Sequence, residues 1–76
     1  MLAQSLGRQI ARLRKRSRLT QEQFAEATGY SVEFISLVER GVNSPTVAGI
    51  ERIAKALHVE PKVLFTFDEK EGGEND

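Results

Sequence analysis

The sequence contains no cysteine and only one histidine. Without cysteine the chain can form neither a disulfide nor a cysteine-ligated zinc site, and His58 alone cannot supply the ligands of a metal site. We therefore expect no metal and no cofactor. A chain of 76 residues forms one domain at most, and a core of that size supplies only about 3 to 5 kcal/mol. Dimerisation is an expected source of further stability.

Long apolar runs are also missing. No run approaches the roughly 18 residues of a membrane span, and Gln and Arg residues between Met1 and Leu13 leave no apolar core for a signal peptide. These features predict an intact cytoplasmic protein without a membrane partner. No segment alternates between apolar and polar residues with the period of a strand, so the sequence predicts an all-α fold.

The net charge is zero, but the charges are unevenly distributed. Residues 1–65 contain ten Lys or Arg and six Glu, which gives +4, and residues 66–76 contain five Asp or Glu and one Lys, which gives −4. The basic body, a domain of residues 1–67, suggests a polyanionic partner, although an ordinary solvated surface would carry the same charges. The acidic tail, residues 68–76, is too charged and Gly-rich to order itself.

Apolar stripes and capping residues divide the body into five helical segments. The first, over about residues 2–17, carries half of the basic residues of the body. Thr20 begins the second with a capping box, in which its hydroxyl accepts from the Gln23 amide and the Gln23 side chain reaches back. Gly29 ends this helix, and Ser31 is the N-cap of a third that Gly41 ends.

The fourth helix has the start signal Ser44-Pro45, typical of an N-cap followed by proline at the first helical position. It ends at His58, where a cation suits the helix dipole and where no ligand or catalytic role is expected. Gly49 inside this helix costs about 1 kcal/mol relative to alanine, which close approach to another backbone would explain. Pro61 opens a shorter fifth helix.

The second and third helices, joined by a tight turn of Gly29 and Tyr30, have the layout of a helix-turn-helix. In this unit the first helix braces the second, whose N-terminal half enters the major groove of DNA. Small helical bundles contain similar corners, so the layout alone does not separate DNA binding from a simple bundle.

The run LTQEQFAEATGYSVEFISLVERGVNSPTVAGIERIAKALHVEP, residues 19–61, resembles the Cro/cI-type (XRE) helix-turn-helix domain of phage repressors and many small bacterial regulators. The resemblance covers nearly all of residues 6–65, including LTQ at 19–21, ERG at 39–41, SPT at 44–46 and IAKAL at 53–57. It implies a compact five-helix, lambda-repressor-like DNA-binding domain with its helix-turn-helix at about residues 20–39. By analogy it also implies a sequence-specific transcriptional regulator.

The resemblance assigns candidate DNA contacts position by position. Gln21 matches a residue that contacts a phosphate at the N-terminus of the bracing helix, a place that favours anions in any case; it could instead be only an exposed capping-box residue. The groove-facing positions are Ser31, Val32, Glu33, Ser36 and Leu37. The loop that contacts the sugar-phosphate backbone, and so sets register without reading sequence, contains Arg40, Asn43, Ser44 and Thr46.

Two further positions match structural residues of the family. Arg14 and Glu39 stand where the family often has an ion pair, and each lies four residues after an apolar residue, so we expect them to meet at the rim of the core. Glu39 is then not a catalytic carboxylate. Phe34 matches a position that often carries an aromatic residue packed against the loop after the helix, and core packing is its expected role.

The outward positions of the third helix lack the Arg, Lys, Gln or Asn that usually contact bases. Within DNA binding, Val32 and Leu37 can contact thymine methyl groups and Glu33 can accept from the cytosine amino group. Phosphate attraction must then come from Arg40, Gln21 and the basic residues of the first helix. The alternative is a protein-binding module or antitoxin-like partner, because an apolar helix surface also marks interfaces. An enzyme is not expected, since no nucleophile stands beside a base.

The sequence therefore predicts a small repressor or controller that binds double-stranded DNA as a homodimer. A palindromic operator should have half-sites roughly 34 Å apart, one helical turn of DNA. No small-molecule ligand is expected. The candidate dimer surface contains Val63, Leu64, Phe65 and Phe67.

Overall fold

A computed structural model describes residues 2–67, which form four α-helices, one 3-10 helix and no strand. The elements are α1 (Leu2–Arg16), α2 (Gln21–Thr28), α3 (Val32–Glu39), α4 (Val47–Leu57) and η1 (Pro61–Phe65). The all-α prediction is confirmed for this part of the chain. The five-helix count is not, because the fifth segment is a 3-10 helix of five residues. The acidic tail lies outside the described residues, and none of the described helices is long and apolar enough to cross a membrane.

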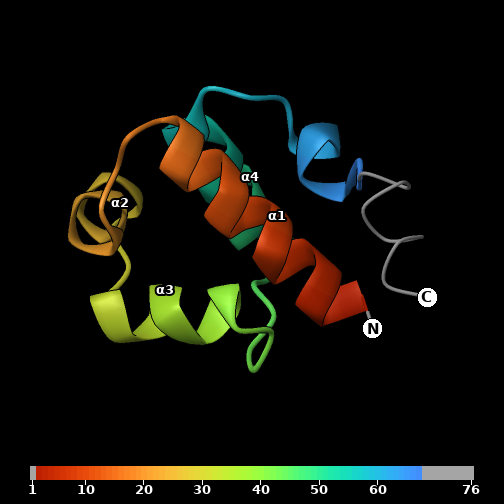
Figure 1. The fold of residues 1–76 in the computed structure, drawn as a ribbon, viewed down its shortest axis with the longest axis horizontal. Helices are drawn as coiled ribbons and strands as arrows, with labels where there is room; N and C mark the ends of the chain where they lie inside the picture. The colour runs from red at the N-terminus through yellow and green to blue at the C-terminus, as the bar shows by residue number, and fades with distance from the viewer. Residues whose placement is uncertain (1, 68–76) are drawn as a thin grey trace.

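The helices pack so that α3 lies along one edge of the molecule (Figure 1). In this view α1 crosses in front of α4, α2 lies to one side, and η1 lies towards the other. α3 packs against α1 and α2, whereas α2 and η1 both pack against α4. The side of α3 that faces away from α1 and α2 is left uncovered by the other described helices.

A single apolar core joins all of these elements. Each contributes one side chain larger than alanine with no more than 1 % of its surface exposed. Burying such a side chain stabilises the fold substantially, since truncating it to alanine typically costs about 2 to 5 kcal/mol. The five side chains, in chain order, are Ile10, Phe24, Ile35, Ile53 and Leu64.

The position of Leu64 corrects the predicted dimer surface. Gln9, which is itself buried, donates from Nε2 to the carbonyl oxygens of Val63 at 2.9 Å and Thr66 at 3.1 Å, and so holds η1 against α1. Leu64 points inward from this turn. The expectation that Leu64 faces a second copy of the chain is wrong, because the core takes up its whole side chain.

The helix ends around the turn follow the sequence signals. The capping box of Thr20 and Gln23 is present, with both hydrogen bonds formed. Gly29 ends α2 in the left-handed conformation with φ of 84°, and the Ser31 hydroxyl accepts from the Phe34 N–H at 3.0 Å. These predictions are confirmed, because each signal acts within one helical turn.

The fourth helix starts two residues later than Ser44-Pro45 predicts. Its N-cap is Thr46, whose hydroxyl accepts from the Gly49 N–H at 3.0 Å, and Pro45 lies before the helix. The sequence analysis explained Gly49 by close approach of another backbone, but its nearest neighbours are side chains: a Cβ there would lie 2.5 Å from the Tyr30 hydroxyl and 3.1 Å from the Pro45 Cβ. Pro45 and Tyr30 thus pack against the first turn of α4, which Thr46 caps.

α1 and α3 approach each other closely through Gly7, which the sequence analysis did not single out. A Cβ at Gly7 would collide with the carbonyl oxygen of Val38 and lie 2.7 Å from that of Glu39. Both carbonyls belong to the last turn of α3. The backbone of α1 can lie directly against the end of α3 only because residue 7 has no side chain.

The ion pair expected between Arg14 and Glu39 is present beside this crossing. Arg14 Nε lies 2.6 Å from Glu39 Oε2, and Arg14 Nη2 lies 3.1 Å from Oε1, so the contact is bidentate. The two side chains are 10 % and 6 % exposed. Arg14 Nη1 also donates to the carbonyl oxygen of Leu19 at 2.7 Å. The pair ties α1 to α3 and to the segment that leads into α2.

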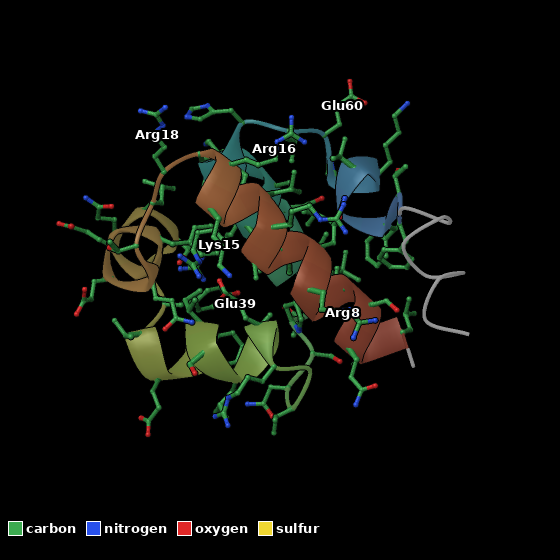
Figure 2. The ribbon with its side chains drawn as sticks, in the orientation of Figure 1. Arg8, Lys15, Arg16, Arg18, Glu39 and Glu60 are labelled. Atoms are coloured by element: carbon green, nitrogen blue, oxygen red, sulfur yellow. The ribbon has the colours of Figure 1, made fainter. Side chains whose placement is uncertain are left out.

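We expect Arg14→Ala to destabilise the fold, because it leaves the Glu39 carboxylate in the interior without its cation. Removing one partner of a buried pair typically costs about 3 to 5 kcal/mol, which urea unfolding would measure. Arg16→Ala is the matched control, since Arg16 is exposed and lies on the opposite side of α1 from Glu39 (Figure 2). An unchanged midpoint for Arg14→Ala would contradict a structural role for the pair.

We also expect Thr46→Ala to destabilise the protein by about 1 kcal/mol, the usual contribution of an N-cap side chain. Ser44→Ala should leave the unfolding midpoint unchanged, because Thr46 caps the helix. Thermal unfolding of the two variants gives the comparison. A larger loss for Ser44→Ala would show that the helix starts where Ser44-Pro45 predicts.

Candidate nucleic-acid interface

The exposed part of α3 is its N-terminal half. Ile35 and Val38 point inward and are buried, while Ser31, Val32 and Glu33 are exposed. α2 packs against the inner side of α3 and precedes it by the turn at Gly29 and Tyr30. This is the geometry in which a braced helix can present its first turns to a groove.

The predicted groove-facing residues differ in the solvent exposure and hydrogen bonding of their side chains. Val32 is 39 % exposed, and Glu33 is also exposed. Ser36 and Leu37 are half-buried, so only part of each side chain is accessible. The Ser31 hydroxyl is already the N-cap of α3. Val32 and Glu33 are therefore the most accessible of these side chains.

The loop after α3 projects from the same edge of the molecule as the outer side of α3 (Figure 1). Gly41, with φ of 79°, and Val42 donate backbone hydrogen bonds to the last turn of α3 and close the helix end. Arg40 is the C-cap residue and is exposed, as are Asn43 and Ser44. This part of the loop is available for backbone contacts.

Thr46 is exposed too, but its hydroxyl is occupied by the cap of α4. The hydroxyl accepts from the Gly49 N–H and keeps its own hydrogen, which it can donate to a phosphate. Ser44, which the sequence predicted as the cap, does not cap α4 in this structure. Both hydroxyl residues of the loop can therefore donate to a phosphate.

The Gln21 side chain makes a hydrogen bond within the protein, and the residue is half-buried. Its Nε2 donates to Glu39 Oε1 at 3.0 Å, which extends the Arg14–Glu39 pair to the first residue of α2. The backbone N–H groups of Gln21 and Glu22 remain, since a helix does not satisfy its own first N–H groups and the Thr20 hydroxyl accepts only from that of Gln23. An anion at this end would be held by those groups and by the helix dipole.

The basic residues of α1 are divided between its two sides, with Arg8 and Lys15 on the side towards α3 in the view of Figure 2. Figure 2 shows Arg16, together with Arg18 of the following loop, on the side of the molecule opposite α3. These two residues therefore point away from the surface that α3 exposes. That the basic residues of the first helix supply phosphate attraction stays a prediction.

A contact that the sequence analysis missed lies behind the turn. Arg52 of α4 donates to the carbonyl oxygen of Thr28, the last residue of α2, and its guanidinium lies over the Tyr30 ring. The Tyr30 ring packs against Phe34 with centroids 4.7 Å apart. Phe34 thus packs against the turn before α3 and against the core, as predicted. No local pattern marks Arg52, which follows the ordinary spacing of a solvated helix face.

His58 does not belong to a group of potential metal ligands among the described residues. It is the exposed C-cap of α4 in the left-handed conformation, with φ of 59°. Within residues 2–67, no group of three or more His, Cys, Asp or Glu side chains could hold a metal ion.

Comparison with known proteins identifies the family. Residues 5–64 match the family described as "Helix-turn-helix domain". The chain is 39 % identical over 61 residues to the uncharacterized HTH-type transcriptional regulator y4dJ of Sinorhizobium fredii, covering 80 % of this chain and 79 % of y4dJ. It is 36 % identical over 62 residues to the control protein C.BamHI of Bacillus amyloliquefaciens, covering 80 % and 76 % of the two chains.

A solved structure has the same fold. The restriction-modification controller protein C.AhdI from Aeromonas hydrophila superposes with a TM-score of 0.81 and 32 % identity, over 83 % of this chain and 96 % of that one. These relatives are named as regulators or controllers and not as enzymes. The sequence match, the shared fold and the exposed α3 agree: the chain belongs to the Cro/cI-type (XRE) helix-turn-helix family of transcriptional regulators.

Proposed function

We propose that this protein is a sequence-specific transcriptional regulator that binds a palindromic operator as a homodimer. The observation that carries the proposal is the exposed N-terminal half of α3, braced by α2 and followed by an exposed loop at the same edge. A helix presented in this way fits the major groove while the flanking loop contacts phosphates. The relatives named as control proteins support a controller role.

Base recognition in this proposal depends on apolar and acidic contacts. Val32 presents methyl groups that can contact thymine, and the Glu33 carboxylate can accept from the amino group of cytosine. Phosphate contacts come from Arg40, Asn43 and the N-terminal turn of α2. This division gives sequence preference to α3 and most of the affinity to the residues around it.

Dimerisation would double the contacts of one small domain. Phe65 is 43 % exposed, and Val63 and Phe67 are half-buried, so these three remain as the proposed dimer surface after Leu64 is removed. They lie on or next to η1, which Gln9 holds in place. Two-fold pairing of such surfaces would place two copies of α3 on successive turns of one face of DNA.

A protein-binding module is the second candidate function. Val42 and Val47, at the two ends of the loop after α3, are 63 % and 80 % exposed. Together with Val32 they expose apolar area near the same edge, and such area often marks a protein interface. In this alternative, DNA binding would be weak or secondary.

Selection of bound sites from a random pool of double-stranded DNA tests the proposal. We expect enrichment of a palindrome whose half-site centres lie roughly 34 Å apart, because two recognition helices must enter the same face of the duplex. Affinity for the enriched site should fall linearly with salt on logarithmic axes. A pool without any enriched sequence would favour the protein-binding alternative.

Glu33→Gln should relax the preference at one cytosine-containing position of the enriched site. The carboxylate accepts from the cytosine amino group, whereas an amide can also donate, so discrimination there should fall by about fivefold or more. Base preference measured across a site library gives the result. Glu51→Gln on α4, an exposed glutamate outside the helix-turn-helix, is the control. Unchanged preference at every position would remove Glu33 from the base-contacting residues.

A further inference from the structure

Arg52 lies on α4, outside the helix-turn-helix unit, yet its side chain ends on the turn between α2 and α3. Its Nε and Nη2 atoms donate to the carbonyl oxygen of Thr28 at 3.1 and 2.7 Å. Thr28 is the last residue of α2, where helix carbonyls lack partners within the helix and the dipole favours a cation. Arg52 therefore closes the end of the bracing helix from a neighbouring element.

The same guanidinium connects to α3 through two aromatic rings. The Arg52 Cζ atom lies 4.5 Å from the centroid of the Tyr30 ring, within the range of a cation–π contact. The Tyr30 ring in turn packs against Phe34 in the first turn of α3, with an interplanar angle of 45°. A continuous contact thus runs from α4 across the turn to the start of the recognition helix.

Two glycines provide the space for this cluster. A Cβ at Gly29 would lie 2.5 Å from Arg52 Nη2, and a Cβ at Gly49 would lie 2.5 Å from the Tyr30 hydroxyl. Gly29 is needed for its left-handed backbone as well, but Gly49 is in a helix and has no backbone requirement of that kind. Glycine is unfavourable inside a helix, but at position 49 the missing side chain leaves room for the Tyr30 hydroxyl.

We propose that Arg52 is a positioning residue that sets the orientation of α3 relative to α2, by clamping the Thr28 carbonyl and the Tyr30 ring from α4. This inference rests on the proposed DNA-binding function for its effect on sequence preference. A helix that reads bases must be held close to its productive orientation, and small displacements remove base contacts before they remove phosphate contacts. Loss of the clamp should therefore reduce specificity and spare non-specific affinity.

The experiment compares Arg52→Ala with Lys55→Ala, which removes the same charge from the same helix. Lys55 is exposed, and its side chain makes no hydrogen bond or ion pair with the described residues. Affinity is measured for the enriched operator and for an unrelated duplex over a series of salt concentrations. For Arg52→Ala we expect the ratio of specific to non-specific affinity to fall about tenfold, with the salt slope unchanged; Lys55→Ala should keep the wild-type ratio.

Two other results would overturn the proposal. Equal losses of both affinities, with a salt slope smaller by about 1, would make Arg52 a phosphate contact. A lower melting temperature with an unchanged affinity ratio would limit Arg52 to stability. If Arg52→Ala does not fold, Arg52→Lys takes its place, because lysine keeps the charge and loses the planar fork; a reduced ratio supports the clamp and a wild-type ratio overturns it.

A second measurement is independent of DNA. Tyr30 is the only tyrosine and the chain has no tryptophan, so tyrosine fluorescence reports on this cluster alone. Arg52→Ala should change Tyr30 emission and shift the backbone amide resonances of α3, whereas Lys55→Ala should change neither. Unchanged α3 resonances in Arg52→Ala would overturn the clamp. If the wild-type protein shows no sequence preference, the proposed function fails, and these spectra still decide whether Arg52 orients α3.

Discussion

The buried carboxylate of Glu39 is the constraint on which the arrangement of the helices depends. A charge with so little exposure is stable only when its oxygens are matched by donors. Arg14 from α1 and Gln21 from α2 supply them, and Gly7 lets the backbone of α1 come close enough for the pair to form. Because Glu39 ends α3, meeting this requirement fixes α3 against both neighbouring helices.

The other end of α3 is fixed by different physics. Phe34 in its first turn packs on Tyr30, and Tyr30 lies beneath the guanidinium of Arg52. An ion pair thus holds the C-terminal end of the helix and an aromatic contact holds the N-terminal end. Both act on the inner side, and Val32 and Glu33 are exposed on the outer side. Short helices such as α3 have little stability of their own, which makes this external support necessary.

Most of the fold and part of the candidate site could be predicted from the sequence. The capping box at Thr20, the left-handed Gly29 and the apolar stripes are set by residues within one turn, so local patterns reveal them. The start of α4 was misplaced because Ser44 and Thr46 are both good caps, and the structure uses Thr46. The role of Leu64 was misjudged for a similar reason, since an apolar residue in a short helix can face either the core or a second copy.

What the sequence by itself determined is the set of helices, the turn between α2 and α3, the family resemblance and the pairing of Arg14 with Glu39. Each depends on short-range spacing or on a long ordered set of residues. Only the tertiary structure decided that the Gln21 side chain serves Glu39, that Arg16 lies away from α3, and that Arg52 reaches the turn. The physical reason is that these contacts join residues far apart along the chain and no pattern marks them. Arg14 and Glu39 are 25 residues apart and Arg52 and Thr28 are 24 apart, but the family resemblance marks only the first pair.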